Sequence, residues 1–153
     1  MQKKPALPFF SIALCLLLFL SLSCQSDEEE LVELPIHREL PVLYSGVSLG
    51  EKEFTVIRSE AELQATFSES LIAEQSILKN VDFTKYSVLV GRGTYTRGIY
   101  ELKHKWLMQG GKRFYRLQVL YDDTLPAGIF YYGVLVDKME EGIEIVFDVE
   151  YSS

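Results

Sequence analysis

The chain has 153 residues and a formal net charge of −7 at pH 7, from 22 Asp and Glu against 15 Lys and Arg. This acidic balance excludes nucleic acid as a partner, because binding to phosphates needs a basic face. The length fits one domain, and 9 Tyr, 9 Phe and 1 Trp supply bulky side chains for its core.

Residues 1–23 have the order of a secretory signal peptide. A basic start is followed by an apolar run over residues 9–22, and the small Ser21 and Ser23 stand just before Cys24. The run is shorter than the roughly 18 to 20 apolar residues that cross a bilayer as a helix. We expect cleavage before Cys24, which removes two Lys and no acid and leaves 130 residues with 13 basic and 22 acidic side chains, a net charge of −9.

A Cys directly after the cleavage site resembles the lipobox of bacterial lipoproteins, in which that thiol carries the lipid. The acidic run at residues 25–30 resembles the export signal of surface-exposed lipoproteins of the Bacteroidetes type. The resemblance implies a protein anchored to the outer membrane through lipid on Cys24 and exposed at the cell surface. An ordinary solvated linker has the same composition, so the periplasmic face is the alternative. With Cys15 removed and Cys24 acylated, the mature domain has neither a disulfide nor a thiol nucleophile.

Residues 24–41 are predicted to form a flexible acidic tether. They carry Pro35 and Pro41 and show no period of 2 or 3.6. His37 lies within this segment. The tether would lift a single globular domain, residues 42–153, off the membrane.

The first part of that domain predicts two short strands and a helix. The strands are expected at residues 42–49 and 53–58. Ser59 and Glu62 form a capping box, in which the hydroxyl and the carboxylate satisfy backbone amides of the first turn. A helix is therefore expected from Ser59, and residues 71–78 are expected to add a further helical turn or two.

The rest of the chain predicts strands. The apolar run at residues 86–90 is typical of a central strand, and residues 99–108 and 112–121 alternate around Gly110-Gly111, which is typical of a tight hairpin. Two more strands are expected at residues 129–136 and 143–151. The fold class is predicted to be α+β: a twisted antiparallel β-sheet or partial barrel of about six strands joined as a meander, with one or two N-terminal helices.

No pattern of catalytic or metal-binding residues is present in the sequence. Neither histidine has the spacing of a metal ligand. His104 shares an apolar strand face with Trp106, which favours a core position over a general base. Asp122 and Asp123 lack the spacing of a calcium loop and are expected to lie in a solvated turn. We therefore expect a protein that is not an enzyme and that holds no metal or cofactor.

Residues 91–98 stand out because three Gly, two Arg and a Tyr fall within one predicted strand connection. Arg92, Tyr95 and Arg97 are the candidate binding residues, since Arg and Tyr are enriched at binding hot spots and this spot is positive on an acidic protein. The alternative is a glycine-bent strand whose arginines pair with the protein's own acids.

Residues 81–85, Val-Asp-Phe-Thr-Lys, followed by residues 87–91, resemble the start of the C-terminal domain of PrcB-type proteins, which are associated with a protease complex. Thr96 and Gly98 match the motif that follows in that family, whereas Arg97 and Ile99 depart from it. The resemblance covers residues 54–119 and bears on fold more than on activity.

These observations favour a membrane-anchored lipoprotein with a small non-enzymatic domain that binds a protein or glycan partner in the cell envelope. The PrcB resemblance implies one alternative, a protease-associated inhibitor or stability subunit. A second alternative is an envelope hydrolase whose carboxylates come from different strands.

Overall fold

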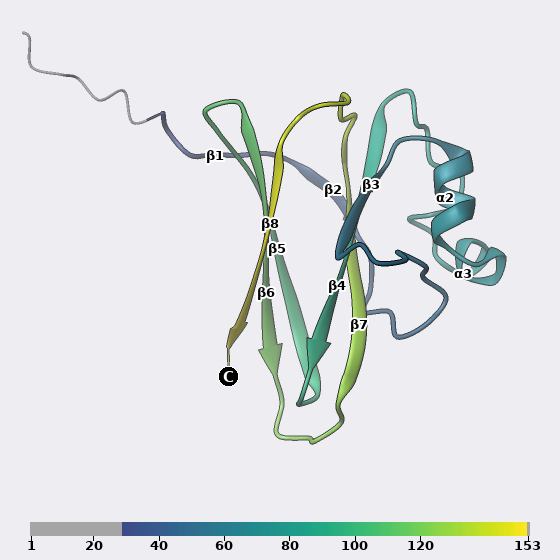
Figure 1. Cartoon of the computed structure of the whole chain (residues 1–153), viewed down its shortest axis with the longest axis vertical. Coiled ribbons are helices and arrows are strands. Elements are labelled where there is room, and N and C mark those ends of the chain that lie inside the picture. The colour runs from purple at the N-terminus through teal and green to yellow at the C-terminus, as the bar shows by residue number, and fades with distance from the viewer. Residues whose placement is uncertain (1–28, 153) are drawn as a thin grey trace, which may run out of the picture.

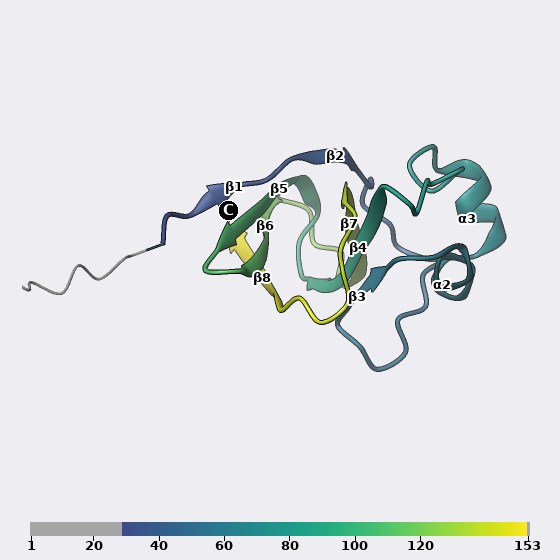
Figure 2. The same ribbon diagram turned by 90° about the horizontal axis from the view of Figure 1, so that it is seen from above.

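A computed structural model describes residues 29–152, so the predicted signal peptide and Cys24 lie outside the described residues. Two four-stranded sheets face each other, and the helices α2 (Glu60–Thr66) and α3 (Glu69–Glu74) cover the outer face of one of them, as Figures 1 and 2 show. None of the helices within residues 29–152 has the length and apolar character needed to cross a membrane.

The two sheets are named A and B. Sheet A has the order β1 (Val32–Glu33), β5 (Ile99–Gln109), β6 (Lys112–Tyr121) and β8 (Ile145–Ser152). Sheet B has the order β2 (Ile36–Glu39), β7 (Gly128–Asp137), β4 (Tyr86–Tyr95) and β3 (Phe54–Ile57).

The predicted α+β class is confirmed, but the predicted single sheet is wrong. The β5–β6 hairpin forms as expected, with positive φ values of 58° at Gly110 and 76° at Gly111. After β6 the chain crosses to sheet B, where β7 pairs antiparallel with β4, and then returns so that β8 pairs parallel with β6. The fold is therefore not a meander, and its sheets do not close into a barrel. Residues 29–152 contain eight strands rather than the predicted number of about six. A short connection does not by itself make consecutive strands neighbours. Strand β7 is apolar on both faces, and in sheet B one face is covered by the helices and the other by sheet A.

The predicted tether is wrong from Val32 onward. Within residues 24–41, β1 pairs with β5 and β2 pairs with β7. The Leu34 amide donates to the Trp106 carbonyl at 2.7 Å, and Leu40 is only 3% exposed. These strands are short and mostly polar, so their pairing partners, rather than their own sequence, determine their structure. The strand expected at residues 42–49 is also wrong, since only isolated bridges form there, at Leu43 and Val47.

The predicted start of the first helix is confirmed. The Ser59 hydroxyl accepts from the Glu62 amide at 3.3 Å, and the Glu62 carboxylate accepts from the Arg58 amide at 2.6 Å. Ser68 caps α3 in the same way, so this helix begins earlier than residue 71. Both helices are short, and each is held by a buried leucine on the face toward sheet B.

Two apolar cores hold the layers together. One lies between the sheets and contains Trp106, Tyr115, Phe130 and Tyr132. The other lies between sheet B and the helices. Because β4 and β7 contribute to both, they are nearly continuous apolar strands.

Candidate functional site

The two packed sheets form a β-sandwich, and the long strands run from one end of it to the other. Glu29, the first described residue, lies beside the β5–β6 hairpin, where its carbonyl accepts from the Gln109 side chain at 2.9 Å. The loops at residues 96–98 and 122–127 lie at the opposite ends of the same strands, at the bottom of Figure 1. A strand of 10 residues such as β6 spans about 30 Å. We call the end formed by these two loops the distal end.

The two distal loops are bonded to each other. The Gly98 amide donates to the Thr124 carbonyl at 3.1 Å, and the Asp122 amide donates to the Gly98 carbonyl at 2.8 Å. A side chain at Gly98 would collide with the side chains of Asp122 and Thr124, which would have to move to make room for it. Hydrogen bonds from the Thr124 hydroxyl and amide lower the pKa of the Asp122 carboxyl. This carboxylate therefore supports the loop locally, in agreement with the predicted solvated turn.

Tyrosines surround these loops. Tyr44 meets Tyr95 edge-on, with ring centroids 5.6 Å apart, and Tyr121 stacks on Tyr151 at 5.9 Å. Burial and then the nearby Tyr95 raise the pKa of Tyr44. Burial and then Tyr151 raise the pKa of Tyr121, against the opposite effect of the Arg97 charge. The hydroxyls of Tyr44 and Tyr121 are therefore protonated at neutral pH and can donate hydrogen bonds.

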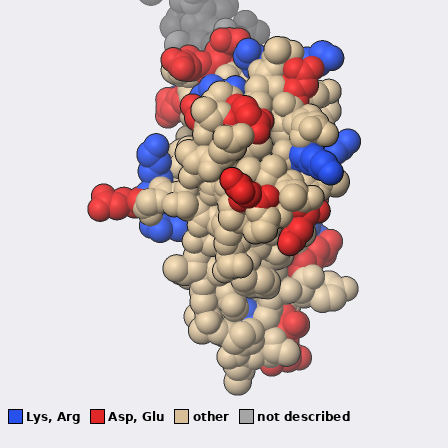
Figure 3. Space-filling model, turned by 90° about the vertical axis from the view of Figure 1, so that its right-hand side faces the viewer, with Lys and Arg blue, Asp and Glu red and all other residues tan. Residues whose placement is uncertain are grey.

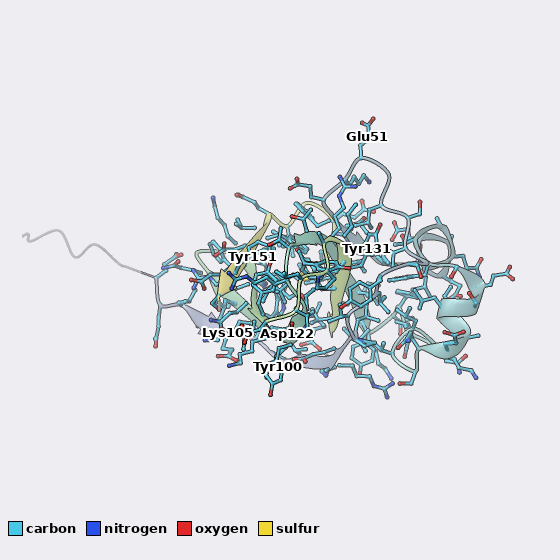
Figure 4. All side chains as sticks on the ribbon, turned by 90° about the horizontal axis from the view of Figure 1, so that it is seen from below. Glu51, Tyr100, Lys105, Asp122, Tyr131 and Tyr151 are labelled. Atoms are coloured by element: carbon cyan, nitrogen blue, oxygen red, sulfur yellow. The ribbon has the colours of Figure 1, made fainter. Side chains whose placement is uncertain are left out.

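The distal end also exposes large apolar side chains. Leu125 is 85% exposed and Tyr100 is 76% exposed. Tyr100 lies at an irregularity between Ile99 and Glu101, where the register of β5 against β6 changes. Figure 4 looks onto this end and shows Tyr100 projecting away from the domain. In Figure 3 the charged side chains gather on the upper part of the face, and the lower part, toward the distal end, is mostly uncharged.

The three predicted binding residues do not form one surface. Arg92 and Tyr95 lie within β4, and only residues 96–98 form the connection. Because side chains alternate along a strand, Arg92 and Tyr95 point to opposite faces of sheet B. Tyr95 belongs to the core between the sheets and the rim of the distal end, and Arg97 is exposed in the loop.

The alternative interpretation, a glycine-bent strand whose arginines pair with the protein's own acids, is correct in part. Gly91 and Gly93 are needed because side chains there would collide with the rings of Tyr132 and Phe130. Neither arginine forms an ion pair with a carboxylate inside the described range, however. Arg92 donates instead to the Gly50 carbonyl at 3.3 Å.

A groove of about 450 Å³ opens where β4 extends beyond the end of β3. We call it the edge groove. It is lined by Glu53, Arg92, Gly93, Thr94, Val149 and Tyr151, together with Ile129. Its lining comes from sheet B on one side and from β8 of sheet A on the other. Because these segments are far apart in the chain, no local pattern in the sequence predicts the groove.

The predicted core position of His104 is confirmed. Its Nδ1 lies 2.7 Å from the Tyr115 hydroxyl, and the two rings stack. Burial lowers the pKa of His104 to about 4. His37 lies elsewhere, with Nε2 2.7 Å from Asp137. Among residues 29–152, no three His, Cys, Asp or Glu side chains are placed to share a metal ion.

The sequence reasoning missed Tyr44, Tyr100, Leu125 and Ile129 as exposed residues of the distal end. Leu125 is the one that the sequence could have revealed, because it is a large apolar residue inside a predicted turn. The others depend on register or on packing between distant segments.

Comparison with known proteins found no match to this chain among family models, curated proteins or solved structures. The resemblance to PrcB-type proteins therefore stays a prediction.

Proposed function

We propose that the chain is a lipoprotein anchored to the cell envelope through Cys24, whose folded part is a non-enzymatic module that binds a protein or glycan partner. The observation that carries the proposal is the exposed, tyrosine-rich distal end, which lies at the far end of the strands from Glu29.

The composition of the distal end suits binding. Tyrosine supplies a large, rigid contact area together with a hydroxyl at low cost in side-chain entropy, and loops at the end of a β-sandwich are a common place for binding residues. Arg97 is exposed beside Tyr121 and is available for a charge-assisted hydrogen bond to a partner. The fixed contacts between the two loops keep this surface in one shape, which reduces the entropy lost on binding.

The position of the distal end suits an anchored protein. The described chain begins beside the β5–β6 hairpin, so an anchor that precedes it attaches near that end. The distal end then lies about 30 Å farther from the point of attachment, within reach of partners in the envelope.

The anchor is tested by metabolic labelling with an alkyne fatty acid in bacterial cells that express the full-length chain. Wild type should carry the label and sediment with membranes. The Cys24→Ala variant should lose both properties, and retention of the label would exclude this residue as the acylation site.

The binding surface is tested with the variant Arg97→Ala/Tyr100→Ala/Leu125→Ala. The matched control changes three exposed residues at the other end, Leu31→Ala/Val32→Ala/Lys112→Ala. Protein partners are captured from envelope extracts, and glycan binding is measured on a glycan array. Loss of hot-spot residues weakens binding by about 2 kcal/mol or more each, or about 30-fold.

Only the distal variant should lose partners that wild type captures. If the control loses the same partners, the binding surface lies elsewhere. If the captured partner is a protease whose activity changes, the alternative of a protease-associated subunit becomes the better description.

A further inference from the structure

Strand β8 lies at one edge of sheet A, opposite the edge formed by β1, and it pairs on one side only. Its partner is β6, with Arg113 opposite Ile145 and Leu120 opposite Ser152. In the part of the chain that the structure describes, no strand pairs with the other side of β8. An unpaired strand edge is a template for the addition of another strand.

The parallel register identifies the backbone groups at this edge. The Arg113 amide donates to the Glu144 carbonyl at 3.0 Å. In a parallel ladder every second residue of a strand directs both its amide and its carbonyl to the same adjacent strand. Val146, Asp148 and Glu150 therefore turn these groups toward β6. The other residues direct their amides and carbonyls away from β6, toward the open side of the sandwich: Ile145, Phe147, Val149 and Tyr151.

The two faces of β8 differ in chemistry. The side chains of Ile145, Phe147 and Val149 point into the core between the sheets. On the outer face Asp148 and Glu150 are exposed. A strand added beside β8 continues both faces, because directly opposite residues place their side chains on the same face.

Apolar surface lies next to this edge on the core side. Phe54 of β3 stacks on Phe147, with ring centroids 4.0 Å apart, and remains 40% exposed. The edge groove opens farther along β8, at Val149 and Tyr151. An added strand with apolar residues at alternate positions would cover these side chains.

The charges on the outer face favour a basic strand. Lys112 and Arg116 of β6 lie 3.1 Å from Glu144 and 3.7 Å from Asp148. Glu150, by contrast, stands opposite Gln118 and has no ion pair among the described residues. A new strand lies about 4.8 Å from β8 and about twice as far from β6, so it is closer to the acidic residues than to these cations.

We propose that β8 accepts an extended peptide segment of a partner protein, in which apolar residues alternate with Lys or Arg. The backbone of the peptide bonds to the free groups of β8, its apolar side chains continue the core face, and its cations stand beside Asp148 and Glu150. This mode of recognition is β-strand addition. It uses the lateral edge of the sandwich and goes beyond the binding proposed for the distal end.

A second copy of the chain is a poor occupant of this edge. If two β8 strands pair antiparallel through their free groups, registers that match most of the strand place Asp148 opposite itself or opposite Glu150. Like charges directly opposite each other destabilise a strand pair.

The test uses the full-length chain, purified in detergent, and blocked peptides as long as β8. One peptide alternates Lys with Val, and its matched control alternates Glu with Val. Hydrogen exchange followed by NMR reports each amide. In the free protein the amides of Ile145, Phe147, Val149 and Tyr151 should exchange rapidly, and the basic peptide should protect them.

The basic peptide should bind about tenfold or more tightly than the acidic one at low salt, since opposite-charge cross-strand pairs are replaced by like-charge pairs. The variant Asp148→Lys/Glu150→Lys should reverse this preference. Glu74→Lys, which makes the same kind of charge change on exposed α3, should leave the preference unchanged.

N-methylated peptides test the backbone pairing. In an antiparallel addition the Val amides face β8, and in a parallel addition the Lys amides do. Methylation of one of these two sets should abolish binding, while methylation of the other set is tolerated. Binding that survives both, equal binding of the basic and acidic peptides, or protection at other amides would overturn the proposal. Concentration-dependent protection of the four edge amides without peptide would also overturn it, by assigning the edge to a second copy.

Discussion

Acidification should destabilise the fold through His104. The imidazole stacks on Tyr115, a fully buried residue, and its Nδ1 lies 2.7 Å from the Tyr115 hydroxyl. Burial lowers the pKa of His104 from 6.5 to about 4. The unfolded chain therefore binds more protons than the folded chain between these two values. The contribution of the neutral His104 imidazole to the free energy of unfolding is fully present above pH 6.5 and is lost as the pH falls toward 4.

The expected loss follows from the size of the pKa shift. One pKa unit corresponds to 1.36 kcal/mol, so the full shift corresponds to about 3 kcal/mol, of which about 2 kcal/mol is lost by pH 5. Hydrogen bonds from Thr84 and Thr124 lower the pKa values of the Asp82 and Asp122 carboxyls from 3.8. These two groups lose their contributions below that pH, so they do not obscure the histidine effect.

The assay is urea unfolding at pH 7.5, 6 and 5, followed by the fluorescence of Trp106, the single tryptophan, which is buried. His104→Gln offers Tyr115 a neutral hydrogen-bond partner and should remove most of the loss between pH 7.5 and 5. The only other histidine is His37, so His37→Gln is the matched control and should keep the loss. A wild-type free energy of unfolding that is constant from pH 7.5 to 5, or a His104→Gln variant that loses as much as wild type, would refute the reasoning.

Four substitutions test the packing and the helix cap. Gly91→Ala places a methyl group against the buried Tyr132 ring and should lower the free energy of unfolding by about 1–3 kcal/mol in urea titrations. Leu40→Ala should lower the free energy of unfolding by about 2–5 kcal/mol, whereas Leu31→Ala, at a residue 42% exposed, should lower it far less. Equal destabilisation by the two variants in thermal unfolding would show that the segment is a flexible tether after all. Ser59→Ala removes the α2 cap and should cost about 1 kcal/mol by the same titrations, and no change would show that the cap is dispensable.

Features encoded by adjacent residues were predicted well. The turn at Gly110-Gly111 follows from the need for positive φ, and the start of α2 follows from the spacing of Ser59 and Glu62. The alternation along β5 and β6 placed His104 and Trp106 on the core face. Each of these patterns reflects a local physical requirement, so a short stretch of sequence is enough to recognise it.

Features that depend on partners were not predicted. β1 and β2 have little apolar character of their own and form because β5 and β7 offer free backbone groups. The candidate binding residues illustrate the same limit, since Arg92, Tyr95 and Arg97 are near in sequence but point to different surfaces.

The sequence by itself determined the acidic charge, the α+β class, the short-range turns and caps, and which strand faces are apolar, because these depend on composition and on residues within one turn or one strand. Only the tertiary structure decided that β7 crosses between the sheets, that β8 pairs parallel with β6, and that the distal end and the edge groove form. An apolar face specifies that it is to be buried but not which surface covers it. Pairing between strands far apart in the chain is settled by the packing of the whole domain.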